Sequence, residues 1–369
     1  MSRVTYLLGA GASYGERQRD EHGQIKRFTR GLPVVNEFAR ALNLLQTDEE
    51  QGPGVVYPHQ EAQKRGVSLN QYEDVRHKLS QLEKACRSFP TIDTLAKQLY
   101  ITDGKFGISE KEYLNYKDLK RYISTALLMM QSEEKRDLRY DGLIASLINL
   151  NREFPSMTIL TWNYDLQFEM AYSGYYISER YIPTLWKDLN VFNKMYPTEF
   201  DAYKAFAMIK LNGTALFTDN TLEAWPVGTK GGVNRVTDCF YGGGNEKPFQ
   251  YGYKYLNGGN YHNMLSYAWE EKNMEALCDA IKARTYDTEE LIVIGYSFPY
   301  VNNKMDSFII DNMPRLRKVI VQDFEDKFVD VKERIEAIAE SSGNKKIEIV
   351  HKKNLQQFYI PNNFGNEST

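Results

Sequence analysis

Cysteine is scarce in this sequence and is never clustered. The 369 residues contain three cysteines, and no two of them have the CxxC spacing: Cys86, Cys239 and Cys278. Structural zinc sites and disulfide frameworks need cysteines in close or paired positions, so the sequence argues against both. We therefore predict no metal site, and we expect a cytoplasmic protein because free thiols are usual in a reducing compartment.

Two further absences concern charge and hydrophobic length. The 46 Lys and Arg residues nearly balance the 49 Asp and Glu residues, for a formal net charge of −3, so the chain lacks the positive charge that draws proteins to nucleic acid. Its first apolar run, at residues 4–8, ends at Gly9 and is too short for a secretion signal or a membrane span. We expect neither direct nucleic-acid binding nor membrane attachment.

Short, β-branched apolar segments alternate with longer helical patterns along the chain. The clearest strand predictions are Val4–Leu8, Met157–Thr161, Leu291–Ile294 and Lys318–Val321, with weaker ones at Ala207–Leu211 and Ile347–Val350. Strands that are apolar on both faces are typical of a parallel sheet covered by helices. The sequence therefore predicts an α/β protein with a doubly wound, mostly parallel sheet.

Two stretches depart from this alternation. Residues 67–150 have apolar residues at helical spacing and predict a helical insertion. Residues 216–262 are rich in Gly, Tyr and Asn and predict a small loop-rich lobe, whose glycines serve either turns or the approach of a phosphate. We expect this lobe to lie over or beside the ligand crevice, within one domain of residues 1–355 that is followed by a polar tail at 356–369.

The first predicted strand ends in a run of small residues, Gly9-Ala10-Gly11-Ala12-Ser13. Small residues at a strand-to-helix junction let backbone amides turn toward an anion, so this loop is a candidate pyrophosphate site. The run is not the G-x-G-x-x-G fingerprint of dinucleotide-dependent dehydrogenases, because the third glycine would fall at Tyr14. Hydride-transfer chemistry is therefore disfavoured.

Asn163 and Asp165 follow the second clear strand, in the segment Thr161-Trp162-Asn163-Tyr164-Asp165. Polar residues at the carboxyl end of a parallel strand face the crevice in which open α/β sheets bind ligands. The same spacing also forms Asx turns that cap a following helix. Ligand contact and helix capping both stay open for this pair.

Two more predicted strands end in short polar motifs. The segment 210–214 (KLNGT) contains Asn212-Gly213, a common tight-turn dipeptide. The segment 294–299 (IGYSFP) places Gly295 and Ser297 at a helix entrance. A glycine and a serine there suit a phosphate or a ribose, and they also suit simple capping.

In this order and setting, the four motifs resemble the SIR2-like (sirtuin-like) domain of bacterial stand-alone and anti-phage defence proteins. The resemblance runs from Gly9 to about the strand at Lys318–Val321, and Pro33 matches the family's proline after the first loop. It implies a Rossmann-like domain that binds NAD. In defence members of the family, it also implies hydrolysis of NAD to nicotinamide and ADP-ribose, with no metal.

The resemblance also assigns site residues. It implies that NAD is bound by Gly9, Ala10, Gly11, Ala12, Ser13, Pro33, Gly213, Thr214, Gly295, Tyr296 and Ser297. Asn163 matches the catalytic asparagine and Asp165 its partner acid. The third catalytic candidate, Asn212, stands where the family usually has a histidine. The zinc-ribbon cysteines of protein-deacetylating sirtuins are missing, so we do not expect a deacylase.

We therefore predict an NAD-consuming enzyme of a bacterial defence system, gated by a trigger or a partner. Its expected ligands are NAD or ADP-ribose, and its expected protein partners are a second copy of the chain or another protein of that system. The substitution at Asn212 motivates an alternative, a catalytically impaired regulatory module that binds NAD or ADP-ribose. A third interpretation is an α/β interaction protein whose glycines only make turns.

Overall fold

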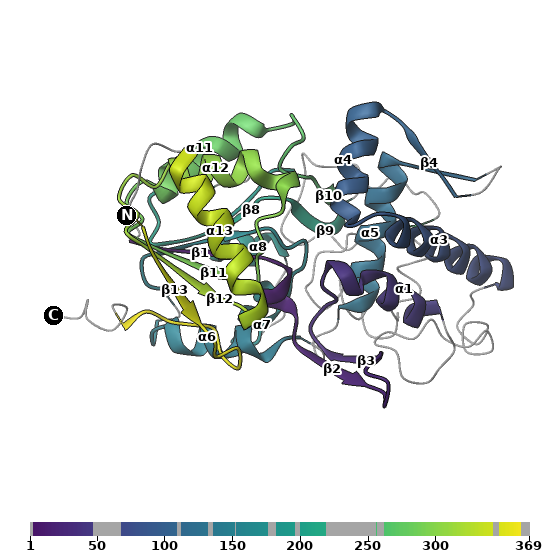
Figure 1. Cartoon of the computed structure of the whole chain (residues 1–369), viewed down its shortest axis with the longest axis horizontal. Helices are drawn as coiled ribbons and strands as arrows, with labels where there is room; N and C mark the ends of the chain where they lie inside the picture. The colour runs from purple at the N-terminus through teal and green to yellow at the C-terminus, as the bar shows by residue number, and fades with distance from the viewer. Residues whose placement is uncertain are drawn as a thin grey trace.

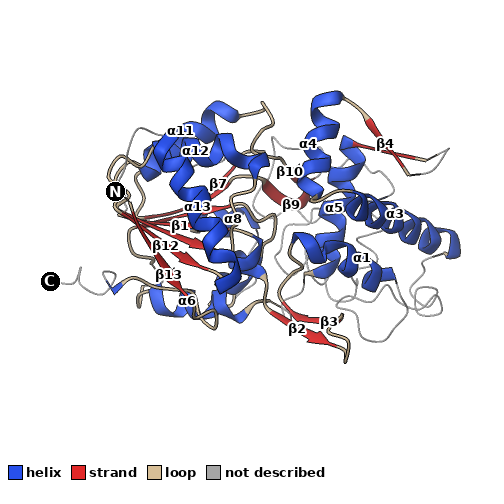
Figure 2. Ribbon diagram, viewed as in Figure 1, coloured by secondary structure: helices blue, strands red, loops and turns tan. Residues whose placement is uncertain are grey.

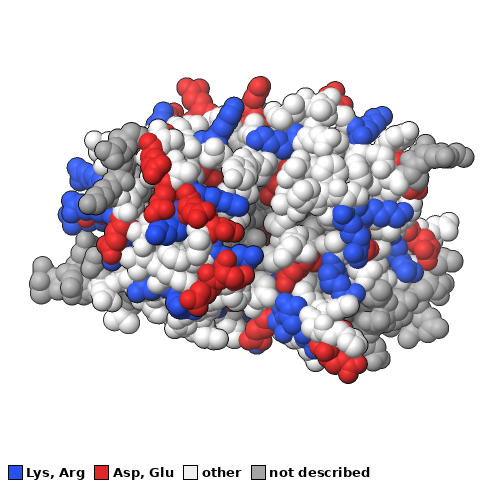
Figure 3. Space-filling model, viewed as in Figure 1, with Lys and Arg blue, Asp and Glu red and all other residues white. Residues whose placement is uncertain are grey.

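A computed structural model describes ten parts of the chain, and every structural statement below concerns these parts. They are residues 3–46, 68–108, 112–131, 136–151, 153–175, 182–195, 200–218, 256, 262–341 and 347–362. A parallel sheet with helices on both faces forms one side of the molecule, and a mainly helical unit lies beside it (Figure 1). Acidic and basic side chains are interspersed over the face shown in Figure 3.

The central sheet has seven strands, all parallel, in the order β13-β12-β11-β1-β6-β8-β7. The bounds are β1 (Val4–Leu8), β6 (Met157–Thr161), β7 (Val191–Asn193), β8 (Phe206–Lys210), β11 (Glu290–Ile294), β12 (Lys318–Gln322) and β13 (Glu348–Lys352). The doubly wound α/β prediction is confirmed, and each of the six predicted strands is present. Strand β7 was not predicted, because three residues are too few to reveal a periodic pattern.

Alternate residues of the strands face two different helical layers, as the pleat of a strand requires. Tyr6 and Leu8 share a buried cluster with three helices, α6 (Leu138–Leu147), α7 (Gln167–Ser173) and α8 (Ile182–Asp188). Leu7 belongs to a cluster on the opposite face, with α11 (Met274–Thr285), α12 (Asn303–Asp311) and α13 (Glu325–Ser341). Figure 2 shows α11, α12 and α13 on one side of the strands and α6 on the other.

The helical unit has a hydrophobic core of its own. It contains α1 (Phe38–Gln46), α3 (Leu69–Ser88), α4 (Ile92–Thr102) and α5 (Tyr116–Met130), with the antiparallel pair β9 (Gly213–Thr218) and β10 (His262–Leu265) packed against α5. Three of these helices fall in the predicted insertion at 67–150. Helix α6 falls in the same interval but packs on the sheet instead, because Leu143 and Ile144 are buried against the strands.

Two hairpins and three short 3-10 helices complete the described chain. The hairpins pair β2 (Glu16–Arg19) with β3 (Ile25–Arg30) and β4 (Lys105–Gly107) with β5 (Tyr113–Asn115), and the 3-10 helices are η1 (Ala10–Ser13), η2 (Val35–Glu37) and η4 (Tyr300–Asn302). Most of the predicted loop-rich lobe at 216–262 lies outside the described residues, so its expected place over or beside the crevice stays a prediction. No helix among the described residues is long and apolar enough to cross a membrane.

Arg284 of α11 forms hydrogen bonds with the amino-terminal end of β6 and with the segment that precedes β8. Its Nε donates to Thr158 Oγ1 (3.1 Å), and its terminal nitrogens donate to the backbone carbonyls of Met157 (3.1 Å), Ala202 (3.0 Å), Ala205 (2.9 Å) and Lys204. The residue is 3% exposed, so its planar guanidinium is a buried donor that these acceptors share.

We expect Arg284→Lys to lower the free energy of unfolding by about 2–4 kcal/mol, because an ammonium group reaches fewer of these acceptors and leaves buried carbonyls unpaired. Urea unfolding measures the change. The same substitution at the exposed Arg317 is the control and should cost less than about 0.5 kcal/mol. An equal effect at the two positions would contradict this role for Arg284.

Candidate functional site

The loops that follow four strands meet at the carboxyl-terminal edge of the sheet. Strand β1 lies between β6 and β11, and the chain winds outward from it in both directions. Open α/β sheets bind ligands where the winding changes direction, outside the carboxyl ends of the strands. Gly295 lines two cavities at this edge.

The first cavity, the central pocket, has a volume of about 140 Å³ and lies between the sheet and the helical unit. Among the residues predicted from the sequence, it is lined by Ala10, Ser13, Pro33, Asn163, Asp165, Asn212, Gly295, Tyr296 and Ser297. Phe38, Ile92, Ile123 and Leu127 form an apolar wall from the helical unit. The fold therefore brings most of the predicted residues to one pocket.

The second cavity, the side pocket, has a volume of about 370 Å³ and is lined by Gly11 among the predicted residues, besides Gly295. Asp323, directly after β12, lies in its wall, and the rings of Tyr14 and Phe324 meet there edge to face at 6.0 Å. Gly9, Ala12, Gly213 and Thr214 line neither cavity.

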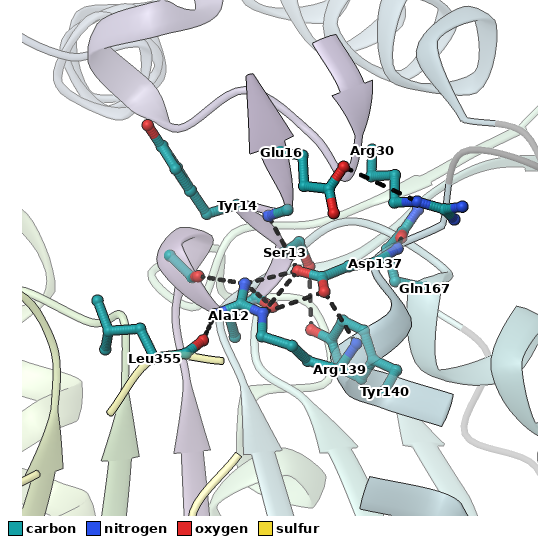
Figure 4. Close-up of polar contacts among 12 residues, drawn as sticks. Ala12, Ser13, Tyr14, Glu16, Arg30, Asp137, Arg139, Tyr140, Gln167 and Leu355 are labelled. Atoms are coloured by element: carbon teal, nitrogen blue, oxygen red, sulfur yellow. Dashed lines mark hydrogen bonds and ion pairs between the residues drawn. The ribbon is translucent and has the colours of Figure 1, made fainter. Parts of the chain in front are cut away.

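Ser13 is the centre of a buried hydrogen-bond network in the central pocket. Its Oγ donates to Asp165 Oδ2 (2.7 Å) and accepts from Asn163 Nδ2 (3.2 Å). Because the hydroxyl has one proton to give, Tyr140 OH donates to Ser13 Oγ at 2.9 Å (Figure 4). Asn163 and Asp165 are 7% and 8% exposed, so their orientation is set by these partners.

A buried ion pair holds the loop that carries Asn163 and Asp165. Lys210 Nζ lies 2.9 Å from Glu169 Oε1, with both side chains at most 2% exposed, and it also donates to the backbone oxygen of Asp165 at 2.6 Å. Trp186 Nε1 donates to the same carboxylate oxygen of Glu169 (3.1 Å). Burial raises the pKa of Asp165, while the nearby Lys210 and the Ser13 hydrogen bond lower it in part.

Asp137 and Arg139 of the α6 amino terminus support the Gly9–Ser13 loop from the side pocket (Figure 4). Asp137 Oδ2 accepts from the Gly15 amide at 2.9 Å and pairs with Arg139. Arg139 donates to the carbonyls of Gly11 and Ala12, both at 3.1 Å. A cation therefore lies on the carbonyl side of this loop.

The glycines of the first and last motifs allow two backbones to touch. The Gly11 amide donates to the Gly295 carbonyl at 2.9 Å, and a Cβ on Gly11 would lie 2.7 Å from Gly295 Cα. The amides of Gly9 and Ala12 also donate to backbone carbonyls, those of Ile294 (3.0 Å) and Gly9 (2.8 Å). Three amides of the loop are thus used within the fold, and its pyrophosphate-binding role stays a prediction.

Asn212 is tied into the backbone around it. Its Oδ1 accepts from the Ala268 amide (2.9 Å), and its Nδ2 donates to the Trp162 carbonyl (3.4 Å). Gly213 has φ +68° at the start of β9, and Thr214 Oγ1 accepts from Asn193 Nδ2 (2.9 Å). None of the four described histidines, His22, His77, His262 and His351, lines the central pocket, and His59 lies outside the described residues.

The structure adds a residue to the central pocket that the sequence did not suggest, Asp93 of α4. The hydroxyl of Tyr164, which stands between Asn163 and Asp165 in the chain, donates to Asp93 Oδ1. In the sequence, Asp93 only follows the helix N-cap Thr91, so nothing connects it to the other motifs. Among the described residues, no group of three or more His, Cys, Asp or Glu side chains is placed to hold a metal ion.

We expect Gly295→Ala to destabilise the protein more than Gly23→Ala does. Both glycines have positive φ, +58° and +77°, so both substitutions cost about 1–2 kcal/mol of backbone strain. A Cβ at Gly295 would also lie 2.4 Å from Gly11, whereas nothing lies within 4 Å at Gly23. Urea unfolding should show about 1–3 kcal/mol of additional loss at Gly295, and equal losses would contradict the close contact.

Comparisons with known proteins identify no family for this chain. Neither the models of known protein families nor the curated proteins give a match. What the protein does is therefore inferred from the residues of the two pockets and from the motifs that line them.

Proposed function

We propose that this protein binds NAD along the carboxyl edge of its sheet and hydrolyses it to nicotinamide and ADP-ribose. One observation carries the proposal: Ser13, Asn163 and Asp165, taken from two distant motifs, form one buried hydrogen-bond network at the pocket. The resemblance of the motif order to SIR2-like domains supports the proposal, because it implies that Ser13 binds NAD and that Asn163 and Asp165 act on it.

Two cavities that meet at Gly295 suit a ligand made of two nucleoside halves joined by a pyrophosphate. In this arrangement the adenosine half occupies the side pocket, where the Asp323 carboxylate accepts hydrogen bonds from ribose hydroxyls and the rings of Tyr14 and Phe324 contact the base. The pyrophosphate then passes the Gly9–Ser13 loop, and the nicotinamide half enters the central pocket.

The central pocket offers groups that suit cleavage of the nicotinamide bond. Trp162 and Tyr296 stack at 5.5 Å beside the apolar wall and favour a flat aromatic ring. When the bond from ribose C1′ breaks, its electron pair passes to the pyridinium nitrogen, and positive charge develops on the ribose. Asn163 can orient a ribose hydroxyl or the attacking water, and Asp165 can stabilise the developing charge.

The geometry of Asn212 favours a second candidate, a regulatory module that binds NAD or ADP-ribose without cleaving it. An amide whose two polar atoms are both engaged with the backbone accepts no proton from water. The defence role, the gating partner or second copy, and the cytoplasmic location are proposals that rest on the motif resemblance and the cysteine content.

Nicotinamide release from NAD by the purified protein tests the two candidates against each other. We expect turnover that falls about 100-fold or more in Asn163→Ala, because a positioned polar group in the pocket is lost, and no change in the exposed control Asn149→Ala. Calorimetry with NAD and ADP-ribose runs in parallel. Binding without turnover supports the regulatory module, and neither binding nor turnover overturns both proposals.

A further inference from the structure

The central pocket holds a second carboxylate that reaches it from the helical unit. Asp93 lies in the first turn of α4, and its only hydrogen bond among the described residues is the one that Oδ1 accepts from the Tyr164 hydroxyl. The other oxygen, Oδ2, therefore has no partner among them. This differs from Asp165, whose two oxygens accept from Ser13 Oγ and from the Gln167 amide (3.0 Å).

Asp93 is thus the one acid of this pocket with an oxygen available for a water molecule. Asn212 has no basic atom, and no described histidine lines the pocket. Resting on the proposed function, we propose that Asp93 is the general base that accepts a proton from the water attacking the ribose.

The surroundings of Asp93 leave its carboxylate without a compensating positive charge. It forms no ion pair among the described residues, and the Nζ of Lys97 on the same helix donates to the Val301 carbonyl instead (2.8 Å). The other titratable groups that face it are Tyr164, Tyr267, Tyr296, Cys86 and, across the pocket, Asp165. Burial raises the pKa of each of the tyrosines and of the thiol, so these four are neutral at pH 7.

Burial raises the pKa of Asp93 to about 6, and the Tyr164 hydrogen bond lowers it in part. A base with a pKa near the working pH combines a large deprotonated fraction with an appreciable proton affinity. Asp93 is therefore charged at neutral pH and protonated below about pH 6. Its titration predicts a rate that rises with pH through this range.

The hydrolysis needs no reactant other than NAD and water. The C1′–N1 bond of NAD breaks and its electron pair neutralises the pyridinium nitrogen, so nicotinamide leaves as a neutral molecule. The oxygen of water bonds to C1′, one proton of that water passes to Asp93 Oδ2, and the proton then leaves to solvent. The products are nicotinamide, ADP-ribose and one proton.

The test compares the wild-type protein with Asp93→Asn and Asp93→Ala. We expect Asp93→Asn to lower kcat/KM for NAD about 100-fold or more and to remove the rise in rate near pH 6, with NAD affinity by calorimetry changed little. Formate added to Asp93→Ala should restore activity at least about 10-fold, since a small carboxylate can enter the space and accept the proton. Asp103→Asn, at the exposed far end of α4, is the matched control and should behave as wild type.

Tyr164→Phe provides an independent readout that does not depend on how well Asp93 variants fold. Loss of the hydrogen bond that lowers the Asp93 pKa should shift the rise in rate to higher pH, while activity at high pH persists. Turnover in Asp93→Asn with the wild-type rate and pH dependence overturns the role of Asp93 and leaves the proposed function intact. Absence of nicotinamide release from the wild-type protein on either side of pH 6 overturns both.

Discussion

The contact between the backbone at Gly11 and the backbone at Gly295 fixes the geometry of the whole site. It joins the loop after β1 to the loop after β11 at the place where the winding of the sheet reverses. Side chains at these positions would hold the two loops apart, because a Cβ on either glycine falls within 2.7 Å of the other backbone. Gly295 lines both the central pocket and the side pocket, so this contact lies where the two cavities meet.

Charge burial sets the second constraint. The ion pair of Lys210 and Glu169 is almost fully enclosed, so removal of either partner would leave an isolated charge in the core. Lys210 also holds the Asp165 carbonyl, and so the strand end of β8 determines where the polar groups after β6 stand. The arrangement of Asn163 and Asp165 is thereby fixed by a residue from a different motif.

Hydrophobic pattern explains what could be predicted from the sequence and what could not. Strands such as β1 and β6 are apolar on both faces, and the polar residues that follow them must therefore meet at one edge of the sheet. Asp93 and Tyr140 could not be located in this way, because they stand on helices whose positions depend on tertiary packing. The contact of Gly9 and Gly11 with the Gly295 loop could not be predicted either. A run of glycines is equally typical of a loop that binds an anion and of a loop whose backbone packs closely against another backbone.

The walls of the central pocket come from two separate hydrophobic cores. Phe38, Ile123 and Leu127 belong to the core of the helical unit, whereas Trp162 and Tyr296 belong to a core of the sheet. A ligand that touches both walls favours the docked arrangement by its difference in affinity for the docked and undocked states. A macromolecule that binds only the outer surface of the helical unit, and favours one of these two arrangements, therefore changes the affinity of the pocket for its ligand without touching the pocket. By thermodynamic linkage, the ligand changes the affinity for that macromolecule by the same factor.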